Sequence, residues 1–458
     1  MSTSECVRLL RAIALASFLM VLIACDSGET DSSASDPPST LNSGILDATL
    51  NGTGFVTQNI SGKGFSDQGF SIAVDNLGRI LVSGASVSTS GDSGLIVWRF
   101  NAAGTPDASF NGGFVTAPAP TANISNSAGN ALTTDQETRI LVAGFSTTGL
   151  TSSSVTVWRF NPNGTPDTSF NGTGSVTQSH SINDIGLAIA RDLNDRILVT
   201  GSSEDPSGIS EMIIWRFNTN GTPDTSFNGT GLVAVRNATG ANSSDKGTSI
   251  TVDGSNRILV AGSGRDLSGN SVMAIWRFNS DGTPDRSFHG TGLTAVRNAI
   301  GDNSSDTGAS IAVDGSGRIL VTGSSQDLAG NSAMIIRRFN SDGTLDTSFH
   351  GTGLTIQQNA LGGNSSDSGN SIAIDVSGRI LVTGSSQDLS GNSAMIVWRF
   401  NSDGTPDTNF NGTGLVVFEL TAQQTNINIG QSIALDTSGR IMVTGTSGKD
   451  MAVWRFVP

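Results

Sequence analysis

The chain has 458 residues, of which 57 are Gly and none is Tyr, and its formal net charge is −14. A sequence pI near 4.5 excludes a basic nucleic-acid-binding protein, because an acidic surface repels phosphate. The apolar residues, 36% of the chain, suffice for a hydrophobic core, which excludes a wholly disordered chain. Two Cys cannot form a disulfide framework.

Residues 1–24 have the pattern of a secretory signal peptide. Arg8 and Arg11 precede an apolar run from 12 to 23. This run has the length of a signal-peptide core and is too short to span a bilayer, which takes about 20 residues. Residues 22–25 read LIAC and resemble the bacterial lipobox, whose Cys is acylated. We therefore predict a lipoprotein signal and lipidation of Cys25; an ordinary signal peptide cleaved nearby, with Cys25 incidental, is the alternative.

Residues 25–43 contain Cys25 and a polar stretch rich in Ser, Asp and Pro, which predicts a disordered tether. A lipid on Cys25 would anchor the protein to a membrane of the bacterial cell envelope, facing the periplasm or the cell surface. Asp26 favours inner-membrane retention in enteric bacteria, but this rule varies between bacteria. The choice between inner and outer membrane therefore stays open.

From residue 44 to residue 458 one unit recurs seven times. Each unit contains an RILVxG-like segment, whose final Gly recurs every 57 to 61 residues. A fixed period of this length is typical of a solenoid, a propeller or an array. The seven glycines are Gly84, Gly144, Gly201, Gly262, Gly323, Gly384 and Gly445.

The fifth unit illustrates the predicted strands. Residues 310–314 (SIAVD) and 318–323 (RILVTG) are apolar runs joined by a Gly-rich turn, which predicts a β-hairpin. A third strand is predicted over 334–340 and a weaker fourth around 353–356, and no window has the period of a helix. Four short strands in each of seven units predict an all-β fold, a seven-bladed β-propeller with four strands per blade.

The phase of the repeat predicts how the two ends meet. The first unit begins at residue 44 with the fourth-strand segment, and the last stops in its third strand, at 454–456. This arrangement favours a closed ring, because the N-terminal strand can complete the last blade and leave no strand edge exposed. We therefore predict that residues 44–57 form the outer strand of the seventh blade and that 44–458 is one domain.

The segments GRILVTG and RFNSDGTPDTSFNGTG resemble the bacterial delta-60 repeat, whose consensus contains DGKILVAG, RYNxDGxLD and an FGxGG segment. Phe replaces the Tyr of RYN in every unit, and Pro often replaces Leu before the Asp. The strand order is similar to that of the NHL-type propeller, which implies that the SIAVD-like strand is innermost. The family implies bacterial surface-associated proteins of unassigned function and supplies no catalytic residues.

With this strand order the connections sort onto two faces of the propeller. The turns between strands one and two, and between strands three and four, are short and share one face, here called the short-turn face. The connections between strands two and three, and from strand four to the next blade, are long and share the long-loop face. Functional residues tend to lie on loops that a rigid scaffold carries, so the long-loop face is the predicted binding face.

One Asp in each of five units is predicted to lie near the centre of the long-loop face. Five carboxylates around a pore could offer the oxygen ligands that Ca²⁺ prefers. The alternative, favoured because seven blades hold these side chains far apart, is that each Asp accepts a backbone N–H of its own turn. The five residues are Asp67, Asp184, Asp245, Asp306 and Asp367, and Ser127 and Asn428 take their place in the second and seventh units.

A second calcium-like pattern lies at residues 279–285, where oxygen-bearing side chains alternate before a Gly. Arg277 and Phe288 occupy the first and twelfth ligand positions of an EF-hand, so the pattern fails. An ordinary turn is predicted there.

Signals for catalysis are few. The three His of the chain are His180, His289 and His350, and of these only His180 lies on a predicted long loop, close to Asp184. No GxSxG, HExxH or P-loop sequence occurs. We therefore predict no catalytic residue and no cofactor other than the possible Ca²⁺.

Repeated charges are predicted to pair within the blades. Fourteen of the 25 basic residues and fourteen Asp occupy fixed positions of the repeat. Once these two sets cancel, the remaining acid is concentrated mainly on the long-loop face, which favours a protein or another cationic partner there.

Together these observations predict a lipid-anchored, extracytoplasmic β-propeller that acts as a binding or scaffold module through its acidic long-loop face. One alternative is a propeller hydrolase or lyase that uses acidic loop residues, with or without Ca²⁺. The other is a structural surface repeat protein without a specific ligand.

Overall fold

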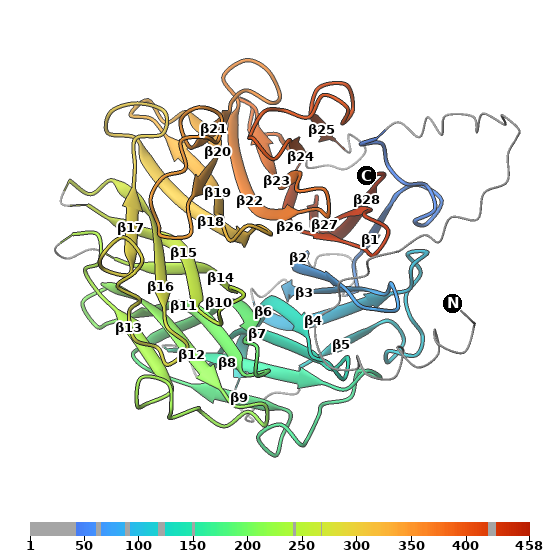
Figure 1. Ribbon diagram of the computed structural model, residues 1–458. Coiled ribbons are helices and arrows are strands. Elements are labelled where there is room, and N and C mark those ends of the chain that lie inside the picture. The colour runs from blue at the N-terminus through green and yellow to red at the C-terminus, as the bar shows by residue number, and fades with distance from the viewer. Residues whose placement is uncertain are drawn as a thin grey trace, which may run out of the picture. The chain divides into compact units, whose positions relative to one another are not determined.

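The computed structural model describes residues 43–60, 66–87, 92–117, 124–148, 152–240, 244–266, 268–419 and 427–458. These residues form 28 strands and no helix, so the predicted all-β fold is confirmed (Figure 1). The described part of the chain accordingly contains no helix long and apolar enough to span a membrane. The predicted signal peptide and Cys25 lie outside the described residues.

The described strands fall into seven groups of four, numbered here as groups 1 to 7, and consecutive strands within a group pair antiparallel. Group 1 is β2 (Ser66–Val74), β3 (Ile80–Val87), β4 (Ser93–Phe100) and β5 (Phe114–Thr116). Group 2 is β6 (Ile124–Thr134), β7 (Ile140–Thr148), β8 (Ser153–Phe160) and β9 (Ser175–Gln178). Group 3 is β10 (Asn183–Arg191), β11 (Ile197–Glu204), β12 (Ser210–Phe217) and β13 (Leu232–Val235). Group 4 is β14 (Lys246–Val252), β15 (Ile258–Arg265), β16 (Ser271–Phe278) and β17 (Leu293–Val296).

The remaining groups repeat the same order of strands. Group 5 is β18 (Ser305–Val313), β19 (Ile319–Gln326), β20 (Ser332–Phe339) and β21 (Leu354–Gln357). Group 6 is β22 (Ser366–Ile374), β23 (Ile380–Gln387), β24 (Ser393–Phe400) and β25 (Leu415–Phe418). Group 7 is β26 (Asn428–Leu435), β27 (Ile441–Ser447), β28 (Asp450–Phe456) and β1 (Phe55–Gln58). Groups 2 and 3 form one eight-stranded sheet, because Asn183 pairs with Ser153 in parallel; each other group is a separate sheet.

The N-terminal strand β1 lies in the last group, not in the first. It pairs antiparallel with β28, from Phe55 opposite Trp454 to Gln58 opposite Met451. The segment before β1 also joins this group, because Leu46 bridges to Phe456. The two ends of the described chain therefore share one sheet.

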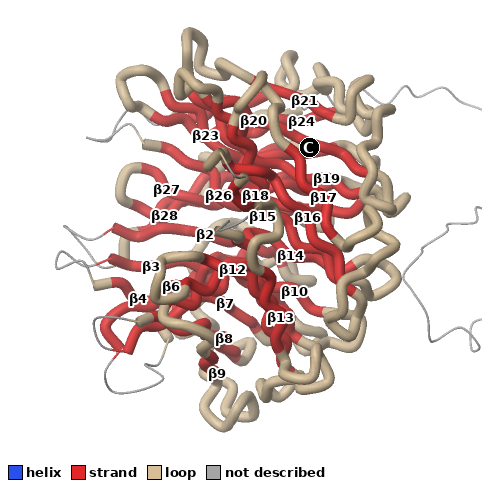
Figure 2. Tube along the Cα trace, turned by 90° about the vertical axis from the view of Figure 1, so that its left-hand side faces the viewer, coloured by secondary structure: helices blue, strands red, loops and turns tan. Residues whose placement is uncertain are grey.

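The first strand of each group lies towards the centre of the fold and the fourth lies outside, as Figure 1 shows. Each first strand contacts the first strand of the next group, from β2 to β26, and β26 in turn contacts β2. Sheets that radiate from a centre in this way form a β-propeller. The connecting loops gather at the ends of the strands (Figure 2).

Both faces of each sheet are apolar because each sheet packs between two neighbours. In β19, Ile319 and Val321 join a core cluster with residues of group 4, whereas Leu320 joins a cluster with residues of group 6. Successive side chains of a strand point to opposite faces, so the uninterrupted apolar run of RILV supplies both clusters.

A bulge in the first strand explains the Gly that recurs in every RILVxG segment. In group 4 the register of β14 against β15 shifts between Gly247 and Ser249, and Gly262 lies opposite Gly247. A Cβ on Gly262 would lie 1.8 Å from the carbonyl oxygen of Lys246, which leaves no room for a side chain. The corresponding distance is also 1.8 Å at Gly84, Gly144, Gly201, Gly323, Gly384 and Gly445.

Candidate functional site

The loops sort onto two faces as predicted. In group 5 the β18–β19 turn at 314–318 and the β20–β21 connection at 340–353 lie at one end of the strands. The β19–β20 loop at 327–331 lies at the opposite end, because paired strands of this sheet run antiparallel. The two faces therefore keep their names, but the predicted lengths are wrong for two connections: the β20–β21 connection has 14 residues, whereas the β19–β20 loop has five.

The five Asp that the sequence placed at the long-loop face are all buried, with no exposed surface. Each accepts a hydrogen bond from a backbone amide of the loop that precedes its own group. The donors are Ile60 N to Asp67 at 2.7 Å, His180 N to Asp184 at 2.6 Å, Ala238 N to Asp245 at 2.8 Å, Ala299 N to Asp306 at 3.1 Å and Ala360 N to Asp367 at 3.2 Å. This is the arrangement that the turn-capping alternative predicts.

The structure does not bring these carboxylates together. Within the described ranges, no three His, Cys, Asp or Glu side chains gather as possible ligands of a metal ion. Each of the five Asp already binds amides within a fully buried site. Calcium binding by these residues stays a prediction.

We expect Ca²⁺ at saturating concentration to shift the Tm of the protein by less than about 1 °C relative to the same sample in EDTA, because a ligand that binds no site in the native state adds no stability. Differential scanning calorimetry measures this directly. Mg²⁺ at equal ionic strength is the control. A Ca²⁺-specific rise of several degrees would contradict the turn-capping interpretation.

Group 5 differs from the others at the centre of this face, because Arg337 takes the place of a Trp. The Arg337 side chain is buried, and its Nη2 lies 2.9 Å from Asp306 Oδ2 and donates to the carbonyl oxygen of Arg297 at 3.1 Å. Ser325 Oγ donates to the other oxygen of Asp306 at 2.6 Å. In group 6 the equivalent Asp367 has no such cation among the described residues, and burial raises its pKa above the usual value of 3.8 despite the hydrogen bond from Ser386.

These two Asp should therefore respond oppositely to the same substitution. Asp306→Asn removes the charge that balances buried Arg337, so we expect a loss of about 3 kcal/mol in unfolding free energy. A double variant that adds Arg337→Trp, the residue of the neighbouring groups, should recover most of it.

Asp367→Asn should be neutral or stabilising at pH 7. A carboxyl group whose pKa is raised by folding favours the folded state below its unfolded pKa, and this contribution is lost as the pH rises through the folded pKa. The gain of Asp367→Asn over the native protein should therefore shrink as the pH falls towards 3. Urea denaturation at several pH values checks both variants. Equal losses of unfolding free energy in Asp306→Asn and Asp367→Asn at pH 7 would contradict the expected difference between the two sites.

The repeated charges pair as predicted. In group 5, Arg318 Nε lies 2.6 Å from Asp314 Oδ2, and Arg338 Nε lies 2.7 Å from Asp346 Oδ2. Burial acts to raise the pKa of Asp346, but hydrogen bonds from Ser348 and Arg338 outweigh it and hold the pKa below its usual value. The same two pairs occur in all seven groups: Arg79–Asp75, Arg139–Asp135, Arg196–Asp192, Arg257–Asp253, Arg379–Asp375 and Arg440–Asp436, and Arg99–Asp107, Arg159–Asp167, Arg216–Asp224, Arg277–Asp285, Arg399–Asp407 and Arg455–Asp47.

Six of the seven arginines on the third strands also tie their group to the next one. The guanidinium of Arg338 stacks over the Phe349 ring, 4.6 Å from its centroid, and its Nη1 donates to the carbonyl oxygen of Ser402 in group 6. Such a buried cation is held by an ion pair, an aromatic face and a backbone acceptor at once. These charges are structural and offer nothing to a partner.

Asp327 in group 5 and Asp388 in group 6 are carboxylates of the long-loop face that form no ion pair with a described basic residue. Asp327 and Asp388 each accept two backbone amides of their own loop and the side-chain amide of an Asn, which lower the pKa of both carboxyls. The equivalent Asp205 and Asp266 of groups 3 and 4 pair with Arg236 and Arg297. A count of charges along the sequence cannot distinguish the paired Asp205 and Asp266 from Asp327 and Asp388. Such a count also assigns the five buried Asp to the acidic surface.

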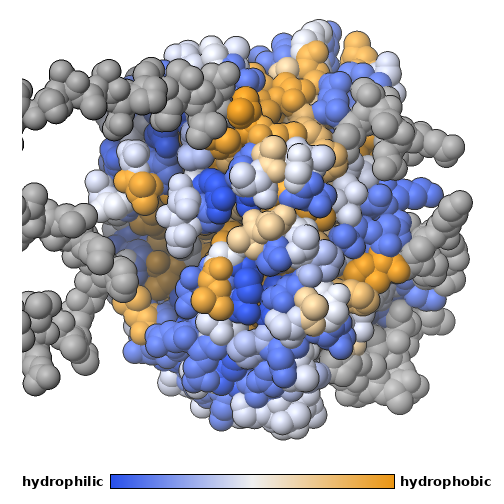
Figure 3. Space-filling view, turned by 90° about the vertical axis from the view of Figure 1, so that its right-hand side faces the viewer, coloured by the Kyte–Doolittle hydropathy of each residue, from blue (hydrophilic) through white to orange (hydrophobic). Residues whose placement is uncertain are grey.

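Each of these two acidic loops carries an exposed apolar side chain. Leu328 follows Asp327 and is 79% exposed, and Leu389 follows Asp388 and is 84% exposed. On the side of the molecule drawn in Figure 3, the described surface is mostly hydrophilic and its apolar side chains lie in separate patches.

The His residues and the calcium-like turn take part in ordinary loop contacts. His180 Nε2 lies 3.3 Å from Glu211 Oε2. His289 and His350 occupy left-handed turn positions, each with a φ of 48°. In the predicted turn at 279–285, Asp281 Oδ1 accepts the Thr283 backbone amide at 2.9 Å, which is turn chemistry.

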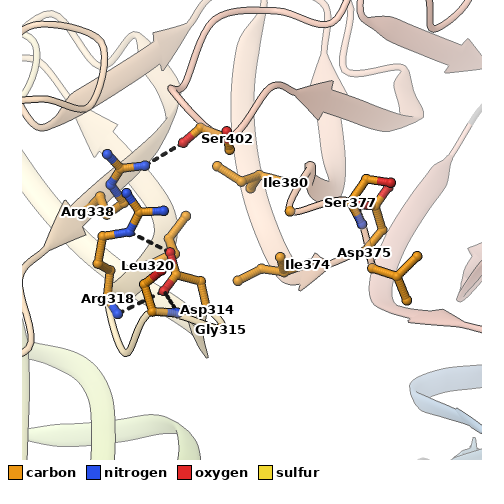
Figure 4. A pocket seen from close by; sticks show the side chains of 13 residues that line it. Asp314, Gly315, Arg318, Leu320, Arg338, Ile374, Asp375, Ser377, Ile380 and Ser402 are labelled. Atoms are coloured by element: carbon orange, nitrogen blue, oxygen red, sulfur yellow. Dashed lines mark hydrogen bonds and ion pairs between the residues drawn. The ribbon is translucent and has the colours of Figure 1, made fainter. Parts of the chain in front are cut away.

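The short-turn face holds a cleft that the sequence analysis missed (Figure 4). Its volume is about 530 Å³, and it lies between the β18–β19 turn of group 5 and the β22–β23 turn of group 6. Gly378 is the fourth residue of its turn, where groups 2, 3 and 4 carry Thr138, Asp195 and Asn256 but groups 1, 5 and 7 also carry Gly, so no residue of the sequence by itself indicates the cleft.

Six segments of the chain match the family described as "Domain of unknown function (DUF5122) beta-propeller": 78–110, 139–170, 194–227, 254–288, 315–349 and 377–410. Residues 299–327 match a second family, described as "Beta-propeller repeat". No curated protein matches the chain. The matched families describe propeller repeats in general and not the delta-60 repeat specifically.

Several solved structures are similar to this chain at low identity. A protein of unknown function from Dyadobacter fermentans has 12% identity and a TM-score of 0.41, with 88% of this chain and 98% of that chain covered. A catalytically inactive virginiamycin B lyase from Staphylococcus aureus has 9% identity and a TM-score of 0.44, with 88% and 99% covered. A polysaccharide lyase, an ulvan lyase, has 9% identity and a TM-score of 0.48, with 86% and 95% covered. The family matches and the repeated four-stranded sheets show that the chain is a β-propeller repeat protein.

Proposed function

We propose that the protein is a lipid-anchored binding or scaffold module of the bacterial cell envelope, which contacts a cationic partner through the long-loop face. The observation that carries this proposal is the division of charge. The repeated Arg and Asp neutralise one another in pairs, whereas Asp327 and Asp388 stand on neighbouring loops without a basic partner among the residues that the structure describes. Rigid sheets hold these two loops, as a binding surface requires.

The proposed scaffold is a closed ring of seven delta-60-type blades, with the N-terminal strand completing the seventh. Contacts between groups 7 and 1 repeat those between groups adjacent in sequence. Ile72 N donates to Ser432 Oγ at 3.4 Å, as Ile311 N donates to Ser249 Oγ at 3.2 Å. Arg455 Nη1 donates to the carbonyl oxygen of Ala102 at 2.6 Å, as Arg338 does to Ser402.

The lipid anchor rests on residues 8–25 and on the polar tether over 25–43. Cys25→Ser should move the protein from the membrane fraction to the soluble fraction and remove the mass of the acyl chains. Fractionation with intact-mass spectrometry distinguishes this from a signal peptide without lipid. An unchanged distribution between fractions would exclude anchoring through Cys25.

The binding face is tested with a fluorescent oligolysine peptide as the cationic probe. The double substitution Asp327→Asn and Asp388→Asn keeps an oxygen acceptor for each turn and removes two charges. We expect at least a several-fold loss of affinity by fluorescence anisotropy, and a loss of binding at high salt.

The matched control changes two charges on the short-turn face. Asp342 and Asp403 are exposed and accept the amides of Thr344 and Thr405 in similar turns. Asp342→Asn with Asp403→Asn should leave the affinity for the peptide unchanged. Equal losses in both double variants, or no binding by the native protein, would overturn the proposed face.

A further inference from the structure

The cleft between groups 5 and 6 has a charged end and an apolar side. The turns at 314–318 and 375–378 form its walls, and Leu320, Ile374 and Ile380 line it (Figure 4). Val376 stands fully exposed at its edge. Its volume of about 530 Å³ is in the range of sites that hold small molecules.

Arg318 lies at the charged end of the cleft, and part of its guanidinium group makes no hydrogen bond within the described residues. Its Nε binds Asp314, and among the described residues its two Nη atoms have no bonding partner. In group 4 the equivalent Arg257 also reaches a second carboxylate, that of Asp285 at 3.8 Å. The Arg318 side chain is 34% exposed, so the free edge of the guanidinium is open to the cleft.

Arg338 lies beside Arg318 at the same end of the cleft (Figure 4). Its three nitrogens are occupied by Asp346, Ser348 and the carbonyl oxygen of Ser402. Each of the two guanidinium groups already has a carboxylate partner, Asp314 or Asp346, but of the two only Arg318 has nitrogens without a partner among the described residues. A planar carboxylate matches the two parallel N–H donors that a guanidinium edge presents.

The equivalent space between groups 2 and 3 is much smaller. Between groups 2 and 3 the same positions enclose only about 20 Å³, lined by Asp135, Arg139, Leu141, Arg159, Asp195, Ile197 and Thr219. Asp195 stands there at the position of Gly378. Asp195 has a φ of 62° and Gly378 a φ of 73°, so the two turns share one backbone conformation. A Cβ on Gly378 would meet only Ser402 Cβ, at 3.9 Å. The two turns therefore share a backbone conformation and differ in their side chains: Asp195 pairs with Arg191 in group 3, whereas Gly378 and Ile374 occupy these positions in group 6.

We propose that this cleft binds a small carboxylate with a short aliphatic body. The carboxylate contacts the free Nη edge of Arg318, and the aliphatic part packs on Ile374, Ile380 and Val376. This site is on the short-turn face, so it goes beyond the proposed function of the long loops and does not depend on it.

N-acetyl-leucine is a suitable probe, measured by isothermal titration calorimetry on the full chain. We expect it to bind at least about tenfold more tightly than N-acetyl-leucinamide, which lacks the carboxylate, and than acetate, which lacks the aliphatic body. Equal binding of the amide would overturn the role of the guanidinium. Absence of binding by N-acetyl-leucine would overturn the site.

Two substitutions test whether N-acetyl-leucine binds in the cleft. Gly378→Asp introduces the residue found at this position between groups 2 and 3, and it should abolish binding while lowering the Tm only slightly, because Asp195 adopts the same backbone conformation. Gly439→Asp makes the same change at the equivalent turn position of group 7, at a φ of 76° and outside the cleft, and should leave binding intact. Retained binding in Gly378→Asp, or equal loss in both variants, would overturn the assignment.

Arg318→Gln tests the donor edge independently, with Arg257→Gln in group 4 as its control. Both substitutions remove the same ion pair within a hairpin turn. Arg318→Gln should weaken N-acetyl-leucine binding at least about tenfold, and Arg257→Gln should not weaken it. Equal weakening would show that the effect comes from the framework and would overturn the proposal.

Discussion

Replacing Gly262 by Ala is expected to unfold the protein or to lower its unfolding free energy by more than about 4 kcal/mol, the range of exceptionally damaging substitutions. The new Cβ would lie 1.8 Å from the carbonyl oxygen of Lys246. Neither strand can move away easily, because Gly262 also pairs with Ala274 in β16 on its other side. Circular dichroism during thermal unfolding measures the loss.

Gly254→Ala is the matched control in the same hairpin. A Cβ there meets no atom within 4 Å, and its φ is not positive. Its effect should stay below about 1 kcal/mol, and a small gain is expected because Ala restricts the unfolded chain. A native-like melt of Gly262→Ala would contradict the close approach at the bulge.

Deleting residues 44–57 is expected to abolish the cooperative unfolding transition. The segment contributes most of β1, and its Leu50 and Val56 are buried in the core between groups 7 and 1. It also contributes Asp47, whose Oδ2 lies 2.8 Å from Nε of the fully buried Arg455. The deletion would leave β28 as an unpaired edge and Arg455 as an unbalanced buried charge.

The control for this deletion is a chain that begins at Ser43 and keeps the whole segment. Its melt should match that of the full chain in calorimetry. Adding a synthetic peptide of residues 43–60 to the deleted protein should restore a transition, because the segment can pair with β28 without a covalent link. An unchanged Tm after the deletion would contradict the proposed closed ring.

Much of the framework could be predicted from single units of the sequence. Strand positions depend on local runs such as RILV and on Gly-rich turns, and residues 44–57 are recognisable as a fourth strand by comparison with the other units. The ion pairs could also be predicted from single units, because their partners are close in the sequence. Arg318 lies four residues from Asp314, and Arg338 lies eight residues from Asp346, so the partners belong to one local turn or hairpin.

The candidate sites could not be predicted in this way. Asp306 and Asp367 occupy the same repeat position, yet only Asp306 has a cationic partner, because Arg337 replaces a Trp on another strand. From the sequence, Asp306 and Asp367 would both be counted as acidic residues of the loop surface, but in the structure both are completely buried.

The sequence by itself determined the strands, their order in each unit, the shared sheet of the two ends and the pairing of the repeated charges. Each of these depends on residues close in one unit or on the phase of the repeat. The tertiary structure alone decided which carboxylates stay on the surface and where a cleft opens. The cleft lies between turns of two groups, and the sequence period places their residues about 60 positions apart without showing which side chains fill the space between them.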